Sequence, residues 1–564
     1  MKLRIASNLV AISLAATAAF VAPRLSAQEP ARTATPETAA YKKIAPLLDG
    51  MGDHTHPIST DSGLAQRYFD QALVLAFGFN HAEAARCFRQ MQALDPDCAM
   101  GYWGEALVLG PNINAPMLDE NVPKAWAALQ KAQEHSDRAS PRHCDYIHAL
   151  AARYAKDTPD DRSSLDQLYA DAMRKLAAKY PEDYDAQTLF AESLMTTTPW
   201  NYWQDDGEPK EVTRELLRTL ERVLARRPSH PFANHLYIHA IEAQHPDWGE
   251  ACADRLRDLV PGAGHLVHMP SHIYIRVARY EEANAANERA IDADQAYITQ
   301  CHAQGLYTLG YVPHNHHFLW FGKAMTGESK DCLAAARHVR RHVDQEKMRE
   351  PGLGTLQHFF TLPMWTYIRF CMWDEALAEE KPAEDVKYPT AVWHFARGMA
   401  LARTGQPKPA QAELVALARF AADQSLDDVT IWDLNTTRDL LQIAQHVLSA
   451  AVAETDADFA TAEKHLRRAV ELEDELNYDE PPSWCIPPRQ LLGALLLEAD
   501  KPAEAEAIYR EELKIYPENG WSLFGLQQAL KGRTEAAAQA KRRFDKAWAN
   551  ADVALASSWQ VRFD

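Results

Sequence analysis

The sequence predicts an all-α fold in which antiparallel helical hairpins stack into an α-solenoid. The chain has 564 residues and only 23 glycines, a balance that favours helix over strand. Apolar residues recur with helical periodicity, and short Gly, Pro and Asp-Pro segments separate helices of about 12–16 residues. A single hydrophobic core stops growing at roughly 250–300 residues, so this length requires several domains or a repeat array. We therefore expect helix pairs from about residue 60 to residue 550.

The first 27 residues have the pattern of a secretory signal peptide. A basic start precedes an almost wholly apolar run from Leu9 to Ala22, and small residues follow at Ser26 and Ala27. An apolar run of this length is too short to cross a bilayer, and no later run is apolar enough to do so. We expect cleavage near Ala27, a flexible leader over residues 28–45, and a periplasmic or secreted protein.

The overall charge argues against a nucleic-acid partner. The formal net charge is −19, and a chain this acidic repels phosphate backbones.

The eight cysteines include no CxxC pair. Most of them are expected to be small buried hydrophobic residues, with one or two disulfides left open.

A repeat of about 34 residues is visible at both ends of the chain and in its centre. Residues at the offsets of a helical hairpin are Ala72, Leu75, Ala84, Phe88 and Pro96, then Tyr274, Ala283 and Ala290, and finally Gly493, Ala505, Tyr509 and Pro517. This pattern resembles the tetratricopeptide repeat superfamily. The segments NHAEAARCF, DPDCAMGYWGEALVLGPN and HLVHMPSHIYIRV also resemble uncharacterised, exported bacterial proteins of this type.

The resemblance implies two helical arrays, over residues 46–350 and 351–564. Stacked hairpins enclose a concave groove, and the superfamily commonly binds peptides or proteins there. We expect a peptide, protein or small ligand in the groove. The irregular segment Met195–Glu211, with three aromatic residues among acidic ones, is expected to form a long loop beside it.

Histidines are concentrated in one part of the chain. Eleven of the 23 lie in residues 230–317. His235 and His239 are spaced i, i+4 behind Pro231, so they share one helix face, and Glu242 follows on that face. His268 and His272 repeat the spacing 33 residues later, close to one repeat. Pro270 could instead begin the helix and leave His268 just before it.

These pairs point to metal chemistry. Equivalent positions in consecutive repeats stack along one side of a solenoid, so four imidazoles could converge with His265 one turn earlier. Neutral imidazole is a common ligand for zinc and copper, and Glu242 could be a ligand or a base. The alternative is that the histidines bond buried backbone groups or line a polar groove.

A third group, His314, His316 and His317, opens a later helix, and we expect His316 or His317 to join the cluster. The predicted metal ligands are thus His235, His239, Glu242, His268, His272, His316 and His317. His54 and His56, near the start of the array, could cap the groove.

No enzyme signature accompanies the cluster. GxSxG, the phosphate-binding GxxxxGK[ST], HExxH, CxxCH and GxGxxG are all missing. Three function classes remain: a groove that binds a divalent transition metal, zinc or copper; a protein-binding or peptide-binding scaffold without metal; and a metal-dependent enzyme at the same histidines.

Overall fold

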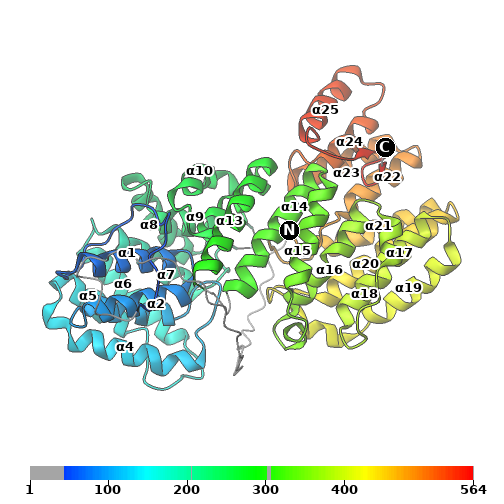
Figure 1. The fold of residues 1–564 in the computed structure, drawn as a ribbon. Helices are drawn as coiled ribbons and strands as arrows, with labels where there is room; N and C mark the ends of the chain where they lie inside the picture. Colours follow the sequence, from blue (N-terminus) through cyan, green and yellow to red (C-terminus); the bar gives the residue numbers. More distant parts are fainter. Residues whose placement is uncertain (1–42, 205, 302–306, 563–564) are drawn as a thin grey trace, which may run out of the picture.

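The computed structural model describes residues 43–562 except 205 and 302–306, and nearly all of its regular structure is helical (Figure 1). The helices of the first half are α1 (Gly63–Phe77), α2 (His81–Leu94), α3 (Ala99–Leu109), α4 (Val122–Glu134), α5 (Pro141–Ala151), α6 (Ser163–Lys179), α7 (Tyr184–Thr197), α8 (Glu211–Arg226), α9 (Pro231–Ile241), α10 (Glu250–Leu259), α11 (Gly264–His268), α12 (Pro270–Arg276) and α13 (Tyr280–Cys301).

The helices of the second half continue the same pattern. They are α14 (Val312–Thr326), α15 (Ser329–His342), α16 (Gly354–Arg369), α17 (Trp373–Ala378), α18 (Lys387–Arg403), α19 (Pro407–Ala421), α20 (Thr437–Thr455), α21 (Phe459–Asp474), α22 (Pro488–Glu498), α23 (Pro502–Ile515), α24 (Gly520–Ala529) and α25 (Thr534–Ala547). The expected all-α class of stacked hairpins is confirmed.

Short elements complete the described residues. Turns of 3₁₀ helix are η2 (Asp119–Asn121), η3 (Ser136–Arg138), η4 (Pro246–Gly249), η6 (Lys347–Arg349) and η7 (Gln424–Asp428), and η5 (Tyr307–Tyr311) is a π-helical turn. Two antiparallel pairs of two-residue strands join β1 (Thr430–Ile431) to β2 (Asn435–Thr436) and β3 (Ala554–Leu555) to β4 (Val561–Arg562).

Close approach between neighbouring helices explains the small residues of the repeat. A Cβ on Gly104 of α3 would lie 2.2 Å from the Phe88 ring of α2. The Tyr509 ring of α23 likewise packs on Gly493 of α22 and Gly525 of α24, where a Cβ would lie 2.4 and 2.1 Å away. A large ring therefore fits only because its neighbour has no side chain. Phe88, Gly493 and Tyr509 are residues at the predicted repeat offsets.

Local sequence also sets the helix ends around the histidines. Pro231 and Pro270 occupy the first turns of α9 and α12, where a missing backbone N–H costs nothing. Pro270 thereby separates α11 from α12, so His268 ends one short helix and His272 lies in the next. The two histidines are close neighbours although they do not share a continuous helix.

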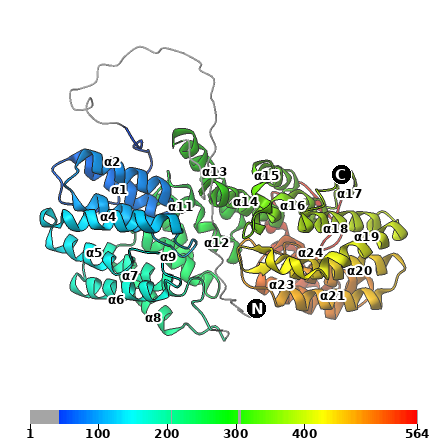
Figure 2. The same ribbon diagram turned by 90° about the horizontal axis from the view of Figure 1, so that it is seen from below.

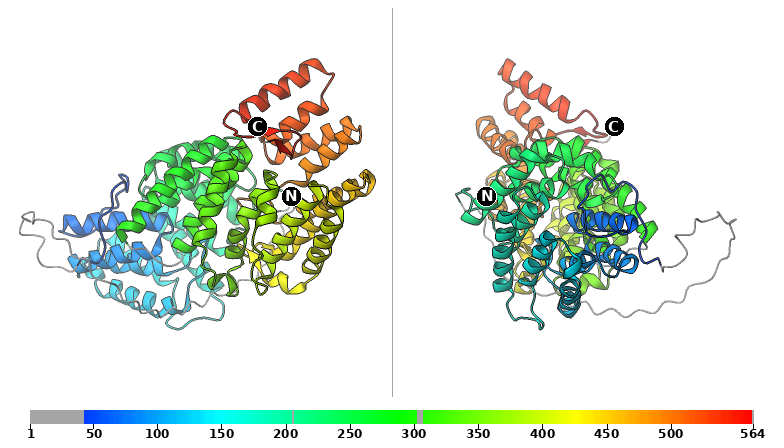
Figure 3. Two further views of the ribbon diagram at one scale, coloured as in Figure 1. Left: turned by 45° about the vertical axis from the view of Figure 1, so that its right-hand side comes forward. Right: turned by 90° about the vertical axis from the view of Figure 1, so that its left-hand side faces the viewer.

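The helices form two lobes (Figure 1). Helices α1–α10 make one lobe and α16–α21 the other, and α13 and α14 lie between them. Figure 2, the view from below, shows α12 and α14 at the same junction. The C-terminal helices, in red in Figure 3, return to the middle of the chain, where the Trp521 indole N–H donates to the Ala324 carbonyl of α14 at 2.9 Å.

Several expectations fall at the chain's ends and borders. The predicted signal peptide and most of the leader, residues 1–42, lie outside the described residues. Position 350, the expected border between two arrays, falls between η6 and α16, and α16 packs on α15 across it.

Among the described helices, none combines the length and the apolar character that a membrane span requires. All eight cysteines are free thiols within the described residues.

Candidate metal centre

A cavity of about 210 Å³ lies where the two halves of the chain meet. Its walls come from α9, α11, α12, η5 and α14 of the central region, and from the β1–β2 connection and the segment before α22 of the C-terminal half. The lining residues are Asn114, Trp200, His239, Glu242, His265, His272, Gly310, Tyr311, His314, Trp432, Leu434, Tyr478, Asp479 and Glu480. Four histidines and two glutamates of this set carry the chemistry.

The first histidine group consists of His268, His272 and His314, and is called group A. Each ring offers one nitrogen, and these nitrogens lie within 4.8 Å of one another. The Nε2 atoms of His268 and His272 are 3.0 Å apart. The His314 ring centroid lies 5.0 Å from that of His268 and 5.8 Å from that of His272. The ring of Phe318 packs against all three histidines and forms their apolar backing.

Hydrogen bonds on the far side of the rings fix the group A tautomers. The Asn287 amide N–H donates to the Ala283 carbonyl at 2.8 Å, so its Oδ1 accepts from Nδ1–H of His268 at 2.6 Å. Nδ1–H of His272 donates to the Glu480 carboxylate at 2.8 Å. When the rings are neutral, both Nε2 atoms then carry a lone pair and no proton. Two lone pairs at 3.0 Å require a proton or a metal cation between them.

The second group consists of His235, His239 and His265, and is called group B. Their ring nitrogens again lie within 4.8 Å of one another, and none of the three residues is more than 3% exposed. Nδ1–H of His235 donates to the Phe77 carbonyl at the end of α1 at 2.6 Å. Nε2 of His235, Nε2 of His239 and both nitrogens of His265 are buried without a hydrogen-bond partner.

Glu242 lies between the two groups. One of its oxygens is 3.4 Å from Nδ1 of His239 in group B, and the other is 3.2 Å from Nδ1 of His272 in group A. Burial opposes its charge, but His272 and His239 outweigh burial and lower the pKa of Glu242 to about 2. Glu242 therefore faces both rings on their Nδ1 side, away from the Nε2 atoms, and the Nδ1–H of His272 is donated to Glu480.

The charge of group A is concentrated on His272. Burial opposes its protonation, but the Glu242 and Glu480 carboxylates outweigh burial and raise the pKa of His272 to about 10. Burial, together with His272, lowers the pKa of His268 well below its usual range, and burial with His268 does the same for His314. Burial also lowers the pKa of His235, His239 and His265. The other five imidazoles are thus neutral and able to offer a lone pair to a metal, and a metal bound at His272 would displace the proton from its Nε2.

The structure brings together most, but not all, of the predicted residues. His239, His272 and Glu242 line the cavity, and the His239 and His272 ring centroids are 5.5 Å apart. His235 and His268 contact these two rings without lining the cavity. Each i, i+4 pair gains its own third histidine, His265 or His314. The ring nitrogens therefore fall into two groups of three rather than one group of four.

His316 and His317 lie outside this cluster, and this corrects the expectation that one of them joins it. His316 stacks on His338 of α15, with ring centroids 3.8 Å apart, and His317 packs against His358 of α16 at 5.5 Å. His314 takes their place. Positions 314 and 316 are about 200° apart around a helix, so a helix that presents His314 to the cavity turns His316 away from it.

Sequence reasoning missed the contribution of the C-terminal half. Trp432, Tyr478 and Glu480 line the cavity from segments that carry no motif. The predicted loop is partly confirmed: α7 continues to Thr197, and the connection after it places Trp200 on the cavity wall, 5.0 Å from the His239 ring. The aromatic residues of that insertion were the one signal available in the sequence.

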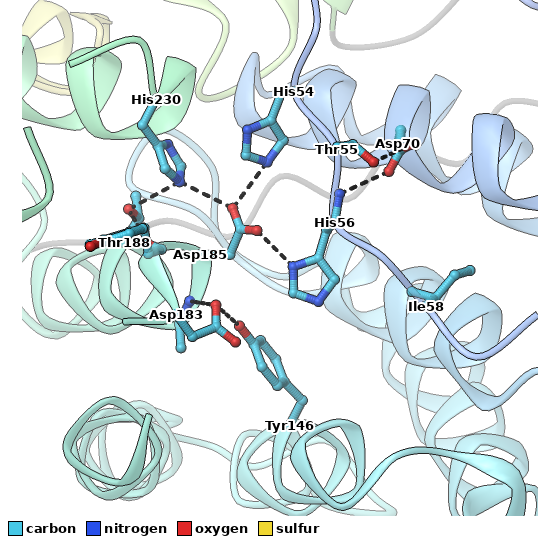
Figure 4. Close-up of polar contacts among 12 residues, drawn as sticks. His54, Thr55, His56, Ile58, Asp70, Tyr146, Asp183, Asp185, Thr188 and His230 are labelled. Carbon is cyan, nitrogen blue, oxygen red and sulfur yellow. Dashed lines mark hydrogen bonds and ion pairs between the residues drawn. The ribbon is translucent and has the colours of Figure 1, made fainter. Parts of the chain in front are cut away.

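A separate cluster holds His54 and His56, which do not line the cavity (Figure 4). The Asp185 carboxylate is 3.0 Å from His54 Nε2, 2.6 Å from His56 Nδ1 and 3.1 Å from His230 Nε2. Burial opposes the charge of Asp185, but the three histidines outweigh burial and hold its pKa well below the usual range. This carboxylate joins the segment before α1 to α7 and to the start of α9.

The hydrogen bonds of His230 show that this second cluster is a hydrogen-bond network. The Ala233 backbone N–H donates to His230 Nδ1 at 3.3 Å, as part of the α9 cap. The neutral ring then carries its proton on Nε2, which donates to Asp185. A nitrogen that carries a proton cannot ligate a metal. His56 donates Nδ1–H to Asp185, and its Nε2 lies 3.3 Å from Nε2 of His143. Groups A and B each gather nitrogens of three imidazoles within 4.8 Å of one another and fit a metal that prefers imidazole.

Comparisons with known proteins add little to this description. No family model and no curated protein matches the chain. Among solved structures, the human IFIT1 dimer with m7Gppp-AAAA aligns at 12% identity over 86% of this chain and 90% of that one, with a TM-score of 0.30. The P58(IPK) TPR domain aligns at 11% identity over 86% of this chain and 98% of that one, with a TM-score of 0.22. The exclusion of nucleic acid here rests on net charge alone and stays a prediction.

Proposed function

We propose that this protein binds a divalent transition metal, zinc or copper, through Nε2 of His268, Nε2 of His272 and one ring nitrogen of His314. The observation that carries the proposal is the 3.0 Å separation of the two Nε2 atoms, both of which are bare when the rings are neutral. Two nitrogens bound to one tetrahedral zinc ion at 2.0–2.1 Å lie roughly 3.3 Å apart. The observed spacing is close to that value.

The surroundings of group A support a metal in three ways. Asn287 and Glu480 bond the outer Nδ1 atoms, as the partners of metal-bound imidazoles usually do. The nearby Glu242 and Glu480 carboxylates offset the charge of a cation. Nδ1 of His314 is buried without a hydrogen-bond partner and supplies the third donor.

The donor set selects the class of metal. Imidazole suits zinc, copper, nickel and iron, whereas calcium and magnesium require oxygen ligands. Three protein ligands beside an open cavity correspond to a zinc site that keeps one position free. When bound, such an ion supplies Lewis acidity to a molecule in the cavity. His272, which lines the cavity, would hold the ion at that wall.

The competing function is a groove that binds a peptide or small molecule without metal. In that case a proton, shared by His268 and a cationic His272, occupies the 3.0 Å gap. Trp200, Tyr311 and Trp432 would then be the main contact surface of the cavity. Metal analysis separates the two functions, because a proton leaves no ion to detect.

We also propose that the protein works outside the cytoplasm, in the periplasm or after secretion. The support is the basic start and the apolar run of residues 9–22, which precede small residues. Transition metals are bound by imidazole in any compartment, so this location is independent of the metal proposal.

The test of the metal proposal is elemental analysis of protein purified without a polyhistidine tag or a metal column. The wild type, dialysed with zinc or copper and then freed of excess ion, is expected to retain bound metal. His268→Ala with His272→Ala should lose the group A ion. The matched control is His148→Ala with His342→Ala, which removes two exposed histidines that belong to neither group A nor group B. Equal metal contents in the wild type and the His268/His272 variant would refute the proposal.

A further inference from the structure

We infer that group B is a second metal site, so that His235, His239 and His265 hold one ion of their own beside group A. The ligand is a divalent transition metal that prefers imidazole nitrogen, such as copper, zinc or cobalt. The inference goes beyond the function proposed above, because it concerns different residues and can succeed or fail separately.

The hydrogen-bond count within group B carries the inference. His235 uses Nδ1–H on the Phe77 carbonyl at 2.6 Å, and its Nε2 is left as a bare acceptor. Nδ1 of His239 faces the Glu242 carboxylate at 3.4 Å, so its Nε2 is also a bare acceptor. Neutral His265 offers one N–H and one lone pair. Three acceptors therefore share a single donor.

Burial makes this imbalance costly. All four of these nitrogens are buried and have no hydrogen-bond partner. A buried acceptor without a partner loses the hydrogen bonds that water gave it in the unfolded chain. A metal cation accepts one lone pair from each ring and so satisfies all three acceptors at once.

An extra proton is a poorer solution than a metal ion. A proton binds one ring nitrogen, whereas an ion coordinates one nitrogen of each of the three buried rings. The facing carboxylate, Glu242, also contacts His272 of group A at 3.2 Å. Further neighbours of group B are aromatic: the Phe79 ring is 4.6 Å from His235, the Tyr311 ring is 4.6 Å from His265, and the Trp200 indole is 5.0 Å from His239.

The geometry of the rings suits a common ligand. The ring centroids of His235 lie 4.8 Å from His239 and 5.0 Å from His265, and the His239 and His265 centroids are 6.3 Å apart. The ring nitrogens lie within 4.8 Å of one another. Phe77, at the end of α1, holds His235 from a segment 158 residues away, so the site closes only in the folded chain.

Group B adjoins group A across Glu242. The centroid distances are 5.5 Å from His239 to His272 and 5.9 Å from His265 to His268. Both groups contribute histidines to the wall of the same cavity. Two occupied sites would form a two-metal centre, in which a small molecule in the cavity contacts both histidine groups.

The test is a titration of the chelator-treated full chain with Co²⁺, followed by calorimetry and by the visible absorption of the bound ion. The wild type is expected to bind two ions per chain. His265→Ala should bind one, with the group A signal retained, and His314→Ala should bind one, with the group B signal retained. The control His148→Ala should bind two ions.

Each outcome decides a separate point. If wild type and His265→Ala bind the same number of ions, the second site is refuted, and a water molecule that donates to two of the nitrogens fills it instead. If His314→Ala binds as much as wild type while His265→Ala loses one ion, group B stands and the function proposed for group A fails. Should His265→Ala not fold, as judged by circular dichroism, His239→Gln is the second variant and must lose the same ion.

Discussion

His268 and His272 approach each other through their Nε2 atoms, 3.0 Å apart, while the Nδ1 atoms bond Asn287 and Glu480. His268 ends α11 and His272 lies in α12, which begins at Pro270. Because the outer bonds hold both rings, the facing nitrogens cannot turn away from each other without breaking one of these bonds. The pair is therefore set to share a cation.

Removal of bound metal should lower the stability of the wild type. An ion that binds only the folded chain stabilises it by about 2.7 kcal/mol at a concentration 100 times its Kd. We expect a chelator to lower the thermal midpoint of the wild type by more than that of the His268/His272 double alanine variant, which keeps group B. Differential scanning calorimetry measures both midpoints, and a chelator effect of equal size in the two proteins would contradict a group A ion.

Asn287→Ala should weaken metal binding although Asn287 is not a metal ligand. Asn287 fixes the tautomer of His268 through the 2.6 Å bond to Nδ1. The loss of such an outer partner typically lowers metal affinity by about 10–100-fold. Competition with a coloured chelator measures the affinity. The control is Gln295→Ala on the exposed face of the same helix, which should bind metal as the wild type does.

Asp185→Asn should destabilise the fold at neutral pH. Its carboxylate contacts three histidines, and the loss of one partner from a buried ionic network costs about 3 kcal/mol or more. Chemical denaturation measures the change. Asp171→Asn is the control, because its exposed pair with Arg174 should contribute at most about 1 kcal/mol.

The same variant should also change the pH dependence of stability. The histidines hold the pKa of Asp185 well below its usual 3.8. The ionised carboxylate therefore contributes its full share to the free energy of unfolding above about pH 4, and that share is lost as the pH falls further. For His54, burial lowers the pKa, but Asp185 outweighs burial and raises it above 6.5, so this contribution is complete below that value and is lost as the pH rises. In Asp185→Asn the free energy of unfolding should lose both of these changes with pH. If it varies with pH in the acid and neutral ranges as in the wild type, this account is contradicted.

Gly493→Ala and Gly525→Ala should each destabilise the C-terminal array. The added Cβ atoms would lie 2.4 and 2.1 Å from the Tyr509 ring, which packs on both glycines. Overpacking of this kind costs about 1–3 kcal/mol. Gly63→Ala is the control, since its Cβ would have no neighbour within 4 Å. Thermal midpoints of the three variants should separate the two packed positions from the open one.

The mature chain should begin near Gln28. The basis is the apolar run of residues 9–22 followed by the small residues Ser26 and Ala27. N-terminal sequencing of protein exported from a bacterial host gives the first residue directly. A chain that keeps Met1 and stays in the cytoplasm would contradict export.

The fold was predictable because its signals are local. Each hairpin repeats its own apolar periodicity and turn residues, and neighbouring residues alone determine both. The i, i+4 spacing of His235 and His239 placed both on one helix face for the same reason, and the structure keeps that pair intact.

The site was only partly predictable because its remaining members come from distant parts of the chain. Glu480 meets His272 across 208 residues, and the Phe77 carbonyl meets His235 across 158. No spacing in the sequence relates these positions. His314 was chosen over His316 by the rotation of α14, which depends on how that helix packs against its neighbours.

The sequence by itself therefore determined the helices, the repeat and a His-rich region able to bind metal, since these depend on short-range periodicity and composition. Only the tertiary structure decided that the histidines divide into two groups of three, with Glu242 between them and Glu480 behind His272. The reason is physical. Helix geometry specifies which side chains share a face, but the burial of apolar surface between distant helices specifies which faces meet.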